Sequence, residues 1–258
     1  MIKKSLVALA IVALLFPVAL ANKRTAASKF APTVGERLNY DVSWSDFIVA
    51  GELTLETKAL EMKDRQSFDR ADGFHVTAQA QSVGLVSAVV YKVNDVYESF
   101  VSAATLQPFR AEKNSRRGKK RQQASITIDQ QKRTARLSDG RTIEIPADTY
   151  DLAGLLFAIR AMDLTQGKSR VFNVLEEDKL YKISVEPETS ERITTPAGTF
   201  DAIRMTTKTI GGGRDSNLYN LKLYVTNDAR RLPVQITAEP SWGTVRVRLT
   251  SITGNQTK

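Results

Sequence analysis

The chain of 258 residues contains no cysteine and only one histidine, His75. Without cysteine it can form no disulfide and no thiolate metal site, and a thiol nucleophile is excluded. A single histidine also excludes a His-rich metal site and a Cys-His catalytic pair. No motif indicates a cofactor. The protein must therefore be stable through packing alone, and its length suffices for a sizeable core.

Long apolar runs are also absent beyond the N-terminus. There, Lys3 and Lys4 precede the apolar residues 6–20, and Ala19 and Ala21 frame a small-residue cleavage site. The apolar run is shorter than the roughly 20 residues that a spanning helix needs. We interpret residues 1–21 as a secretory signal peptide, with an uncleaved anchor as the alternative. This predicts a protein in the periplasm or associated with the envelope, without an integral membrane segment once the signal is removed.

Acidic residues are outnumbered by basic ones, 28 to 37, which gives a net charge of +9. A basic exported protein can favour anionic partners such as lipid head groups or acidic glycans, although solubility alone can explain the balance. Nucleic acid is not expected as a partner. The basic stretch lacks the interleaved aromatic residues that stack on bases, and the expected compartment is wrong.

The dominant pattern is an alternation with period two, which gives each strand one apolar and one polar face. In residues 221–239, Leu221, Leu223 and Val225 alternate with polar residues, and the alternation resumes at Val234 after an Asn-Asp turn. This predicts an antiparallel strand pair. The first strand is expected within residues 34–44, with Leu38, Tyr40, Val42 and Trp44 on its apolar face.

Residues 149–162 are the one good helix candidate. Leu152, Leu155, Leu156 and Ile159 recur at spacings of three and four and form an apolar stripe. Asp148 or Thr149 is expected to cap the N-terminus, with Asp151 in the first turn. Because the apolar surface is wide, we expect the helix to be largely buried against the mouth or the concave face of the sheet.

These patterns predict a mainly β protein: a single curved antiparallel sheet or incomplete β-barrel of about ten to thirteen strands, with one packed α-helix. Residues 33–254 are expected to form this single domain. Residues 22–32 are interpreted as a flexible N-terminal tether and residues 255–258 as a frayed C-terminus.

Several short motifs occur in a fixed order along the chain. They are G-E-R-L-x-Y-D-V-S-W at residues 35–44 with Ala-Gly-Glu at 50–52, Tyr-Glu-Ser at 97–99, L-x-P-x-R-x-E-K at 106–113, T-P-A-G-T-F at 195–200, and V-T-N-D-A-R-R-L-P-V at 225–234. In this order the sequence resembles DUF3108, a family of exported bacterial proteins, over about residues 32–254. The resemblance implies an envelope location and a β-rich fold, and it supplies no catalytic residues.

Two groups of residues are candidates for binding. A curved sheet encloses a concavity, and concave apolar sites suit lipids and other amphiphiles. The side chains expected to line such a cavity are Tyr40, Trp44, Leu155, Phe157 and Ile159. A cluster of basic residues could contact anionic head groups or glycans, or could simply be a solvated hairpin tip. Its members are Arg110, Lys113, Arg116, Arg117, Lys119, Lys120 and Arg121.

The leading hypothesis is therefore a non-enzymatic exported protein that binds an apolar or lipid-like ligand or an anionic envelope component. The first alternative is a carboxylate-dependent hydrolase of envelope glycans, for which Asp41, Glu52, Glu56, Asp95 and Glu98 fall in predicted strands. The second is a scaffold that pairs with a partner through an open sheet edge. His75 is expected on the wetter face of its strand, at the surface or in a cleft.

Overall fold

The computed structural model describes residues 30–44, 48–61, 64, 72–84, 87, 92–210, 220–240 and 243–254. The predicted signal peptide, the first eight residues of the predicted tether and the predicted frayed C-terminus lie outside these residues. Of the helices in the described part, none combines the length and the apolar composition that a bilayer-spanning helix requires.

The described chain is almost entirely strand and turn, because period-two alternation persists along nearly all of it. The strands are β1 (Arg37–Trp44), β2 (Ile48–Ala59), β3 (Gly73–Ser82), β4 (Val93–Ser102), β5 (Pro108–Arg117), β6 (Lys120–Asp129), β7 (Thr134–Leu137), β8 (Thr142–Glu144), β9 (Thr149–Tyr150), β10 (Arg170–Glu176), β11 (Lys179–Thr195), β12 (Gly198–Thr209), β13 (Leu221–Thr226), β14 (Pro233–Ala238) and β15 (Val245–Thr253). Helix α2 spans Leu152–Ala161.

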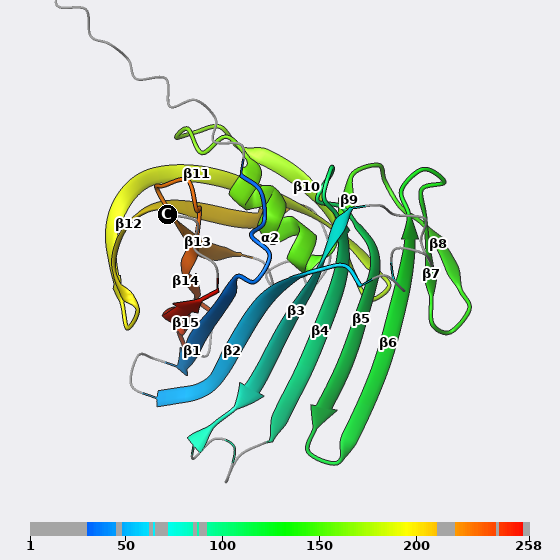
Figure 1. The fold of residues 1–258 in the computed structure, drawn as a ribbon, viewed down its shortest axis with the longest axis horizontal. Helices are drawn as coiled ribbons and strands as arrows, with labels where there is room; N and C mark the ends of the chain where they lie inside the picture. Colours follow the sequence, from blue (N-terminus) through cyan, green and yellow to red (C-terminus); the bar gives the residue numbers. More distant parts are fainter. Residues whose placement is uncertain are drawn as a thin grey trace, which may run out of the picture.

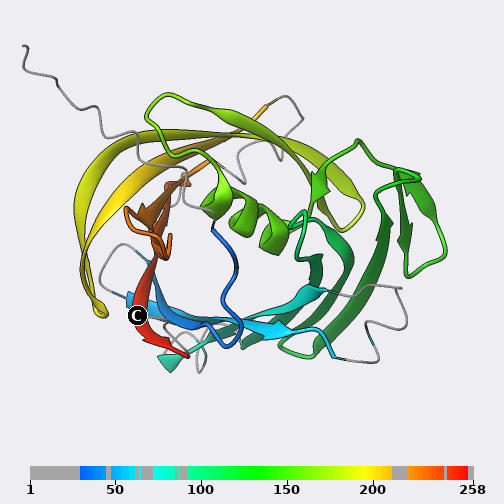
Figure 2. The ribbon, with the colours of Figure 1, turned by 45° about the horizontal axis from the view of Figure 1, so that its top comes forward.

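All fifteen strands belong to one sheet, in the order β8-β7-β6-β5-β4-β3-β2-β1-β15-β14-β13-β12-β11-β10-β9. Consecutive strands from β1 to β8 and from β10 to β15 pair as antiparallel neighbours, β1 pairs with β15 in the same way, and β9 pairs with β10 in parallel. The sheet curls into an incomplete ring with α2 inside its curve (Figures 1 and 2). The predicted fold class is confirmed, and so is the hairpin within residues 221–239. The number of strands exceeds the expected range.

The two ends of the sheet are β8 and β9, and no ladder of hydrogen bonds joins them within the described residues. The sheet is therefore open rather than a closed barrel. An open edge is compatible with strand addition by a partner, so the scaffold hypothesis stays a prediction.

Helix α2 starts later than the sequence predicts, because Thr149 and Tyr150 form β9. Asp151 is the N-cap: its side chain accepts a hydrogen bond of 2.7 Å from the backbone N–H of Gly154. The predicted caps, Asp148 and Thr149, were wrong. Asp151 is the better cap because it combines the extended backbone with the side-chain reach that a cap requires.

Helix α2 separates two large hydrophobic clusters and packs into both. One lies against β10 to β13 and includes Leu155, Ile159 and Phe172. The other lies against β1 to β4 and β12 to β15 and includes Tyr40 and Phe157. Burial of these side chains, at about 25 cal/mol per Å² of apolar surface, holds the helix inside the curve of the sheet.

The residues that precede β1 also pack into this interior. The ring of Phe30 stacks on Phe157 with a centroid separation of 6.3 Å, and Pro32 is buried. The end of the predicted tether is therefore packed structure. Sequence alone does not reveal this, because residues 22–32 show no periodicity.

Candidate functional site

The basic cluster forms a hairpin, β5–β6, that turns at Gly118 and Lys119. Three of its seven cations are engaged by carboxylates. Arg110 pairs with Glu112, Lys113 with Glu177 at 2.7 Å, and Arg117 with Asp95 at 2.7 Å. The remaining four members, Arg116, Lys119, Lys120 and Arg121, are exposed toward the hairpin tip. The structure thus divides the predicted cluster into three residues that pair with carboxylates and four that form no ion pair with a described carboxylate.

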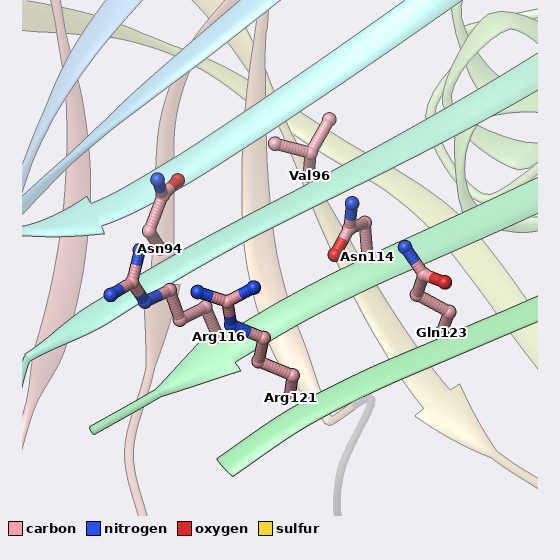
Figure 3. Close-up of a pocket in the computed structure, with 6 residues that line it drawn as sticks. All are labelled: Asn94, Val96, Asn114, Arg116, Arg121 and Gln123. Atoms are coloured by element: carbon pink, nitrogen blue, oxygen red, sulfur yellow. The ribbon is translucent and has the colours of Figure 1, made fainter. Parts of the chain in front are cut away.

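A shallow hollow of about 490 Å³ lies on the outer face of β4, β5 and β6 (Figure 3). We call it the outer hollow. It consists of two rows of three residues that face one another across the strands: Asn94, Arg116 and Arg121 in one row, Val96, Asn114 and Gln123 in the other. The alternation of each strand therefore places three amides, two guanidiniums and one apolar side chain on one surface.

Arg116 and Arg121 are cross-strand partners in the outer hollow. Figure 3 shows their guanidinium groups over the same part of the sheet, beside Asn94. No carboxylate among the described residues forms an ion pair with either arginine, and none lines the hollow. Like charges directly opposite one another destabilise a sheet. A bound anion would relieve this repulsion, and the three amides add donors for its oxygens.

The same outer face carries a second hollow, in which most of the lining residues are acidic rather than basic. A hollow of about 410 Å³ is lined there by Glu61, Asp64, His75, Glu98, Phe100, Arg110 and Glu112. His75 stacks on Phe100 with a centroid separation of 4.5 Å, and its Nε2 lies 2.9 Å from Oε1 of Glu98. His75 thus lies in a cleft on the polar face, as its parity predicts. No group of His, Asp and Glu within the described residues has a metal-binding arrangement.

A third hollow, of about 240 Å³, lies where β5 and β6 approach the turn between β10 and β11. We call this boundary the seam and the hollow the seam cavity. Its apolar lining consists of Tyr97, Ala111, Ala124, Ile126, Leu152 and Leu175. Its polar lining consists of Asp95, Glu112, Lys113, Arg117, Glu176 and Glu177.

Two carboxyl groups of the seam cavity are in contrasting environments. Burial alone would raise the pKa of Asp95, but hydrogen bonds from Arg117 and Ser115 lower it below the usual value. Burial raises the pKa of Glu176, and the positive charge of Lys113 only partly offsets this effect. Among the hollows described above, the seam cavity is the one in which an acid considered for hydrolysis, Asp95, lies with a carboxyl group of raised pKa, that of Glu176.

Below the seam cavity, Asp151 joins α2 to β4. It is 1% exposed, and its Oδ2 accepts a hydrogen bond of 2.5 Å from the Ser99 hydroxyl. Tyr97 also hydrogen-bonds to this carboxylate. Burial raises the pKa of Asp151 despite these bonds, and burial beside Asp151 raises the pKa of Tyr97. The network fixes the N-terminus of α2 and orients Tyr97 toward the cavity.

The side chains predicted to line a ligand cavity have other roles in the described structure. Tyr40 and Phe157 are packed in one hydrophobic cluster, and Leu155 and Ile159 in the other. Trp44 is 43% exposed, contrary to the prediction of an inward position. It is the last residue of β1, at the end of the strand remote from α2, where the core no longer covers it (Figure 1). The cavities described above are lined by other residues.

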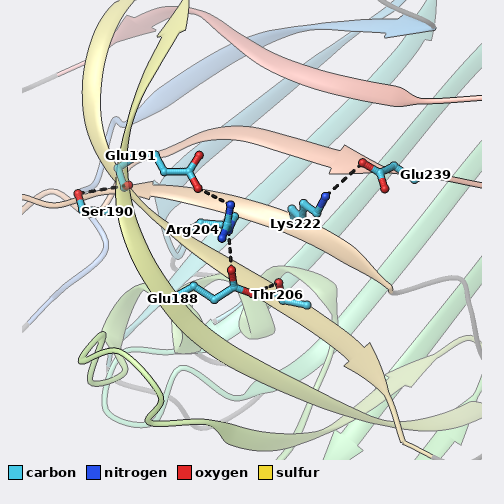
Figure 4. Close-up of polar contacts among 8 residues, drawn as sticks. Glu188, Ser190, Glu191, Arg204, Thr206, Lys222 and Glu239 are labelled. Carbon is cyan, nitrogen blue, oxygen red and sulfur yellow. Dashed lines mark hydrogen bonds and ion pairs between the residues drawn. The ribbon is translucent and has the colours of Figure 1, made fainter.

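A polar cluster on β11 to β14 stabilises an irregularity of the sheet. The pairing of β11 with β12 shifts between Pro187 and Ser190. Arg204 spans this bulge and contacts both Glu188, at 2.5 Å, and Glu191 (Figure 4). Hydrogen bonds from Thr206 and Arg204 lower the pKa of Glu188. These acids are ion-paired and serve the geometry of the bulge.

Comparison with known proteins gives a fold and a family. The chain is similar to the crystal structure of a beta-barrel-like protein of domain of unknown function DUF1849 from Brucella abortus. The TM-score is 0.61 at 10% identity, over 88% of this chain and all of that one. A DUF1089 family protein from Pseudomonas aeruginosa matches with a TM-score of 0.40 and 11% identity, over 70% of this chain and 87% of that one.

No curated protein matches the sequence. The model of the family described as "Protein of unknown function (DUF3108)" matches residues 39–250. This match covers most of the chain and includes all strands from β2 to β14. It confirms the resemblance that the short motifs indicate, and the chain belongs to the DUF3108 family.

Proposed function

We propose that this protein is an exported, non-enzymatic binding protein that recognises a phosphate-bearing component of the envelope through the outer hollow. The observation that carries this proposal is the cross-strand pair of Arg116 and Arg121, placed among three amides and without a carboxylate in the lining. Two guanidiniums can bind phosphate oxygens in a bidentate manner, which lysines cannot do. The N-terminal signal pattern supports a location in the periplasm or at the envelope.

The test compares two double variants of the same hairpin. R116Q/R121Q removes two positive charges from the outer hollow, and K119S/K120S removes two from the turn beside it. Both change the net charge equally, so a purely electrostatic attraction would weaken equally in both. We expect R116Q/R121Q to weaken binding at least about tenfold and K119S/K120S to have a much smaller effect.

Binding is measured by calorimetry with inorganic phosphate and by flotation with phosphatidylcholine vesicles that contain phosphatidylglycerol, at low salt and at about 0.15 M. Selective loss in R116Q/R121Q for both probes indicates a phosphate site. Loss for vesicles alone indicates recognition of a lipid head group. Equal loss in the two double variants, or no loss in either, contradicts a built site.

The hydrolase alternative is favoured by one observation, the contrasting carboxyl groups of Asp95 and Glu176 in the seam cavity. In inverting and retaining glycosidases, such a difference in environment keeps one carboxyl group protonated as the general acid and the other ionised as the base or nucleophile. However, Arg117 and Ser115 donate hydrogen bonds to both oxygens of the Asp95 carboxylate, which favours a structural role for Asp95. The test is the release of reducing ends from purified peptidoglycan, where D95N/E176Q should equal the wild type.

A further inference from the structure

The hairpin of β1 and β2 carries exposed apolar side chains at its end. Ile48 is the cross-strand partner of Trp44, and Trp44 pairs on its other side with Val245 of β15. Trp44, Ile48 and Val49 are 43%, 46% and 45% exposed, and we call these three residues the apolar tip. Single exposed hydrophobic residues are common, whereas a contiguous apolar surface marks contact with a protein or a membrane.

The β5–β6 hairpin ends at the same level of the sheet as the apolar tip. One row of cross-strand neighbours crosses β2 to β6, and its members are Gly51, Ser82, Val93, Arg117 and Lys120. The apolar tip lies directly beyond this row along β2, and the turn at residues 118–119 lies directly beyond it along β5. Both hairpins therefore end on the side of the sheet that is remote from α2 (Figure 1).

This end of the sheet is amphipathic, because exposed cations accompany the apolar tip. The cations that form no ion pair with a described carboxylate are Arg116, Lys119, Lys120 and Arg121. Asp41 and Glu52 lie further from the end of the β1–β2 hairpin, where they are cross-strand partners. Arg248 is the other neighbour of Asp41, and Glu52 accepts a hydrogen bond of 3.0 Å from Gln81. The positive charge of the β5–β6 turn is therefore available to an anionic partner.

The combination fits the surface of an anionic bilayer. Tryptophan favours the head-group region, because its ring is apolar and its indole N–H is polar. Lysine and arginine attract anionic head groups, and this attraction adds to the burial of apolar side chains. Strands β2 and β5 are about 15 Å apart across the sheet. A flat, extended surface can therefore meet both hairpin ends at once, which favours a bilayer over a small ligand.

We propose that this end of the sheet docks on an anionic bilayer, which the strands approach end on. The apolar tip enters the head-group region, and the cations of the β5–β6 hairpin meet lipid phosphates. Arg116 and Arg121 each lie two residues from the turn at residues 118–119, so the outer hollow lies beside the head groups. The inference names the partner of the outer hollow, and its electrostatic part rests on the proposed function.

The first test compares two double variants that each remove two exposed apolar side chains. W44S/I48S changes the apolar tip, whereas V171S/L180S changes β10 and β11, which are far from β1 and β2 in the order of the sheet. Binding is measured by flotation with phosphatidylcholine vesicles that contain phosphatidylglycerol. We expect W44S/I48S to bind at least about tenfold more weakly than the wild type, and V171S/L180S to bind normally. Circular dichroism and Tm verify that both variants fold.

Normal binding by W44S/I48S, or equal losses in the two double variants, would overturn the role of the apolar tip. If the wild type floats with none of the vesicles at low salt, the bilayer is overturned as the partner in favour of a protein.

The second test follows Trp44 in the folded protein. The chain has two tryptophans, so W242F leaves Trp44 as the only one. With vesicles that contain phosphatidylglycerol, we expect its emission to shift to shorter wavelength and to be quenched by lipids with brominated acyl chains. Vesicles of phosphatidylcholine alone should cause a much smaller change. Unchanged emission from vesicle-bound W242F would overturn insertion of the apolar tip.

Failure of this proposal and failure of the phosphate proposal are distinguishable. Neither Trp44 nor Ile48 lines the outer hollow, so W44S/I48S should bind inorganic phosphate like the wild type in calorimetry. Insertion of Trp44 without any binding of inorganic phosphate would remove the phosphate site and support the docking surface. Phosphate binding that R116Q/R121Q abolishes, without insertion of Trp44, would do the reverse.

Discussion

Arg160 of α2 and Glu36, which precedes β1, form a two-bonded ion pair in the interior of the curved sheet. The two nitrogen–oxygen distances are 2.7 and 2.9 Å, although the residues are 124 positions apart in the sequence. The residues are 1% and 7% exposed. Arg160 also donates to the carbonyl of Arg230 at 3.0 Å and lies over the ring of Phe30. The pair thus links α2, the segment before β1 and the β13–β14 connection.

Removal of one partner should destabilise the protein strongly, because the other charge would remain buried. We expect E36A or R160A to lower the free energy of unfolding by about 3–5 kcal/mol. The double variant E36L/R160M replaces both charges with apolar groups and should lose much less than the sum of the single effects. Urea denaturation measures all four proteins. A loss in E36L/R160M as large as the sum of the two single losses would contradict this expectation.

The buried N-cap Asp151 should make stability depend on pH in a defined direction. Its folded-state pKa is raised, mainly by burial, so the folded protein holds the proton more tightly than the unfolded chain. The stability from this group is complete below the unfolded pKa, about 3.9, and is lost as pH rises through the folded pKa.

The measurement compares wild type with D151N in urea denaturation from acid to neutral pH. Asparagine is a good N-cap but does not titrate, so the stability of D151N relative to wild type should increase with pH. D151A lacks the cap altogether and should lose about 1–2 kcal/mol. A decrease in the relative stability of D151N with pH would indicate a lowered pKa and contradict the expectation.

The opposed arginines of the outer hollow predict a conflict between stability and binding. R116E places a carboxylate opposite Arg121, and opposite charges stabilise a strand pair by about 0.2–1 kcal/mol. We therefore expect R116E to raise Tm slightly at low salt while it abolishes phosphate binding. Added phosphate should raise the Tm of wild type but not that of R116E. A lowered Tm in R116E would contradict the repulsion inferred for the wild type.

Gly51 has a steric reason to be glycine. The pairing of β1 and β2 skips Ala50, and an added Cβ at Gly51 would lie 2.7 Å from the backbone carbonyl oxygen of Gln81. G51A should therefore cost about 1–3 kcal/mol, because backbone atoms must move. K58A, on an exposed part of the same strand, should stay within about 0.5 kcal/mol of wild type. Denaturation midpoints of equal value for the two variants would refute this expectation.

The sequence predicts local features of the fold well. The strand pair expected within residues 221–239 is present, and the wetter face assigned to His75 is correct. Prediction fails where distant segments determine the environment. Trp44 is an even number of residues from Tyr40 and should share its face of β1, but it is exposed because it lies past the end of the core. The alternation predicts on which face of a strand a side chain lies, but not how far along the strand the core extends.

The candidate sites were only partly accessible from the sequence. The basic hairpin is evident in residues 110–121, but the sequence does not show which of its cations pair with carboxylates. Lys113 and Arg117 share the inner face, where Glu177 and Asp95 pair with them. The seam cavity has no sequence signal, since its lining comes from β4, β5, β6, α2 and the β10–β11 turn. The alternation of β5 and β6 could have identified Arg116 and Arg121 as neighbours.

Alternation with period two and one apolar stripe at helical spacing were sufficient to determine a β-rich domain with a single packed helix, because side-chain direction is a local property of the backbone. The tertiary structure alone decided which edge stayed open, which cations met carboxylates and where space remained between strands. These outcomes depend on how far the sheet curls and on which distant side chains it brings into contact, and curvature accumulates over fifteen strands rather than within any one of them.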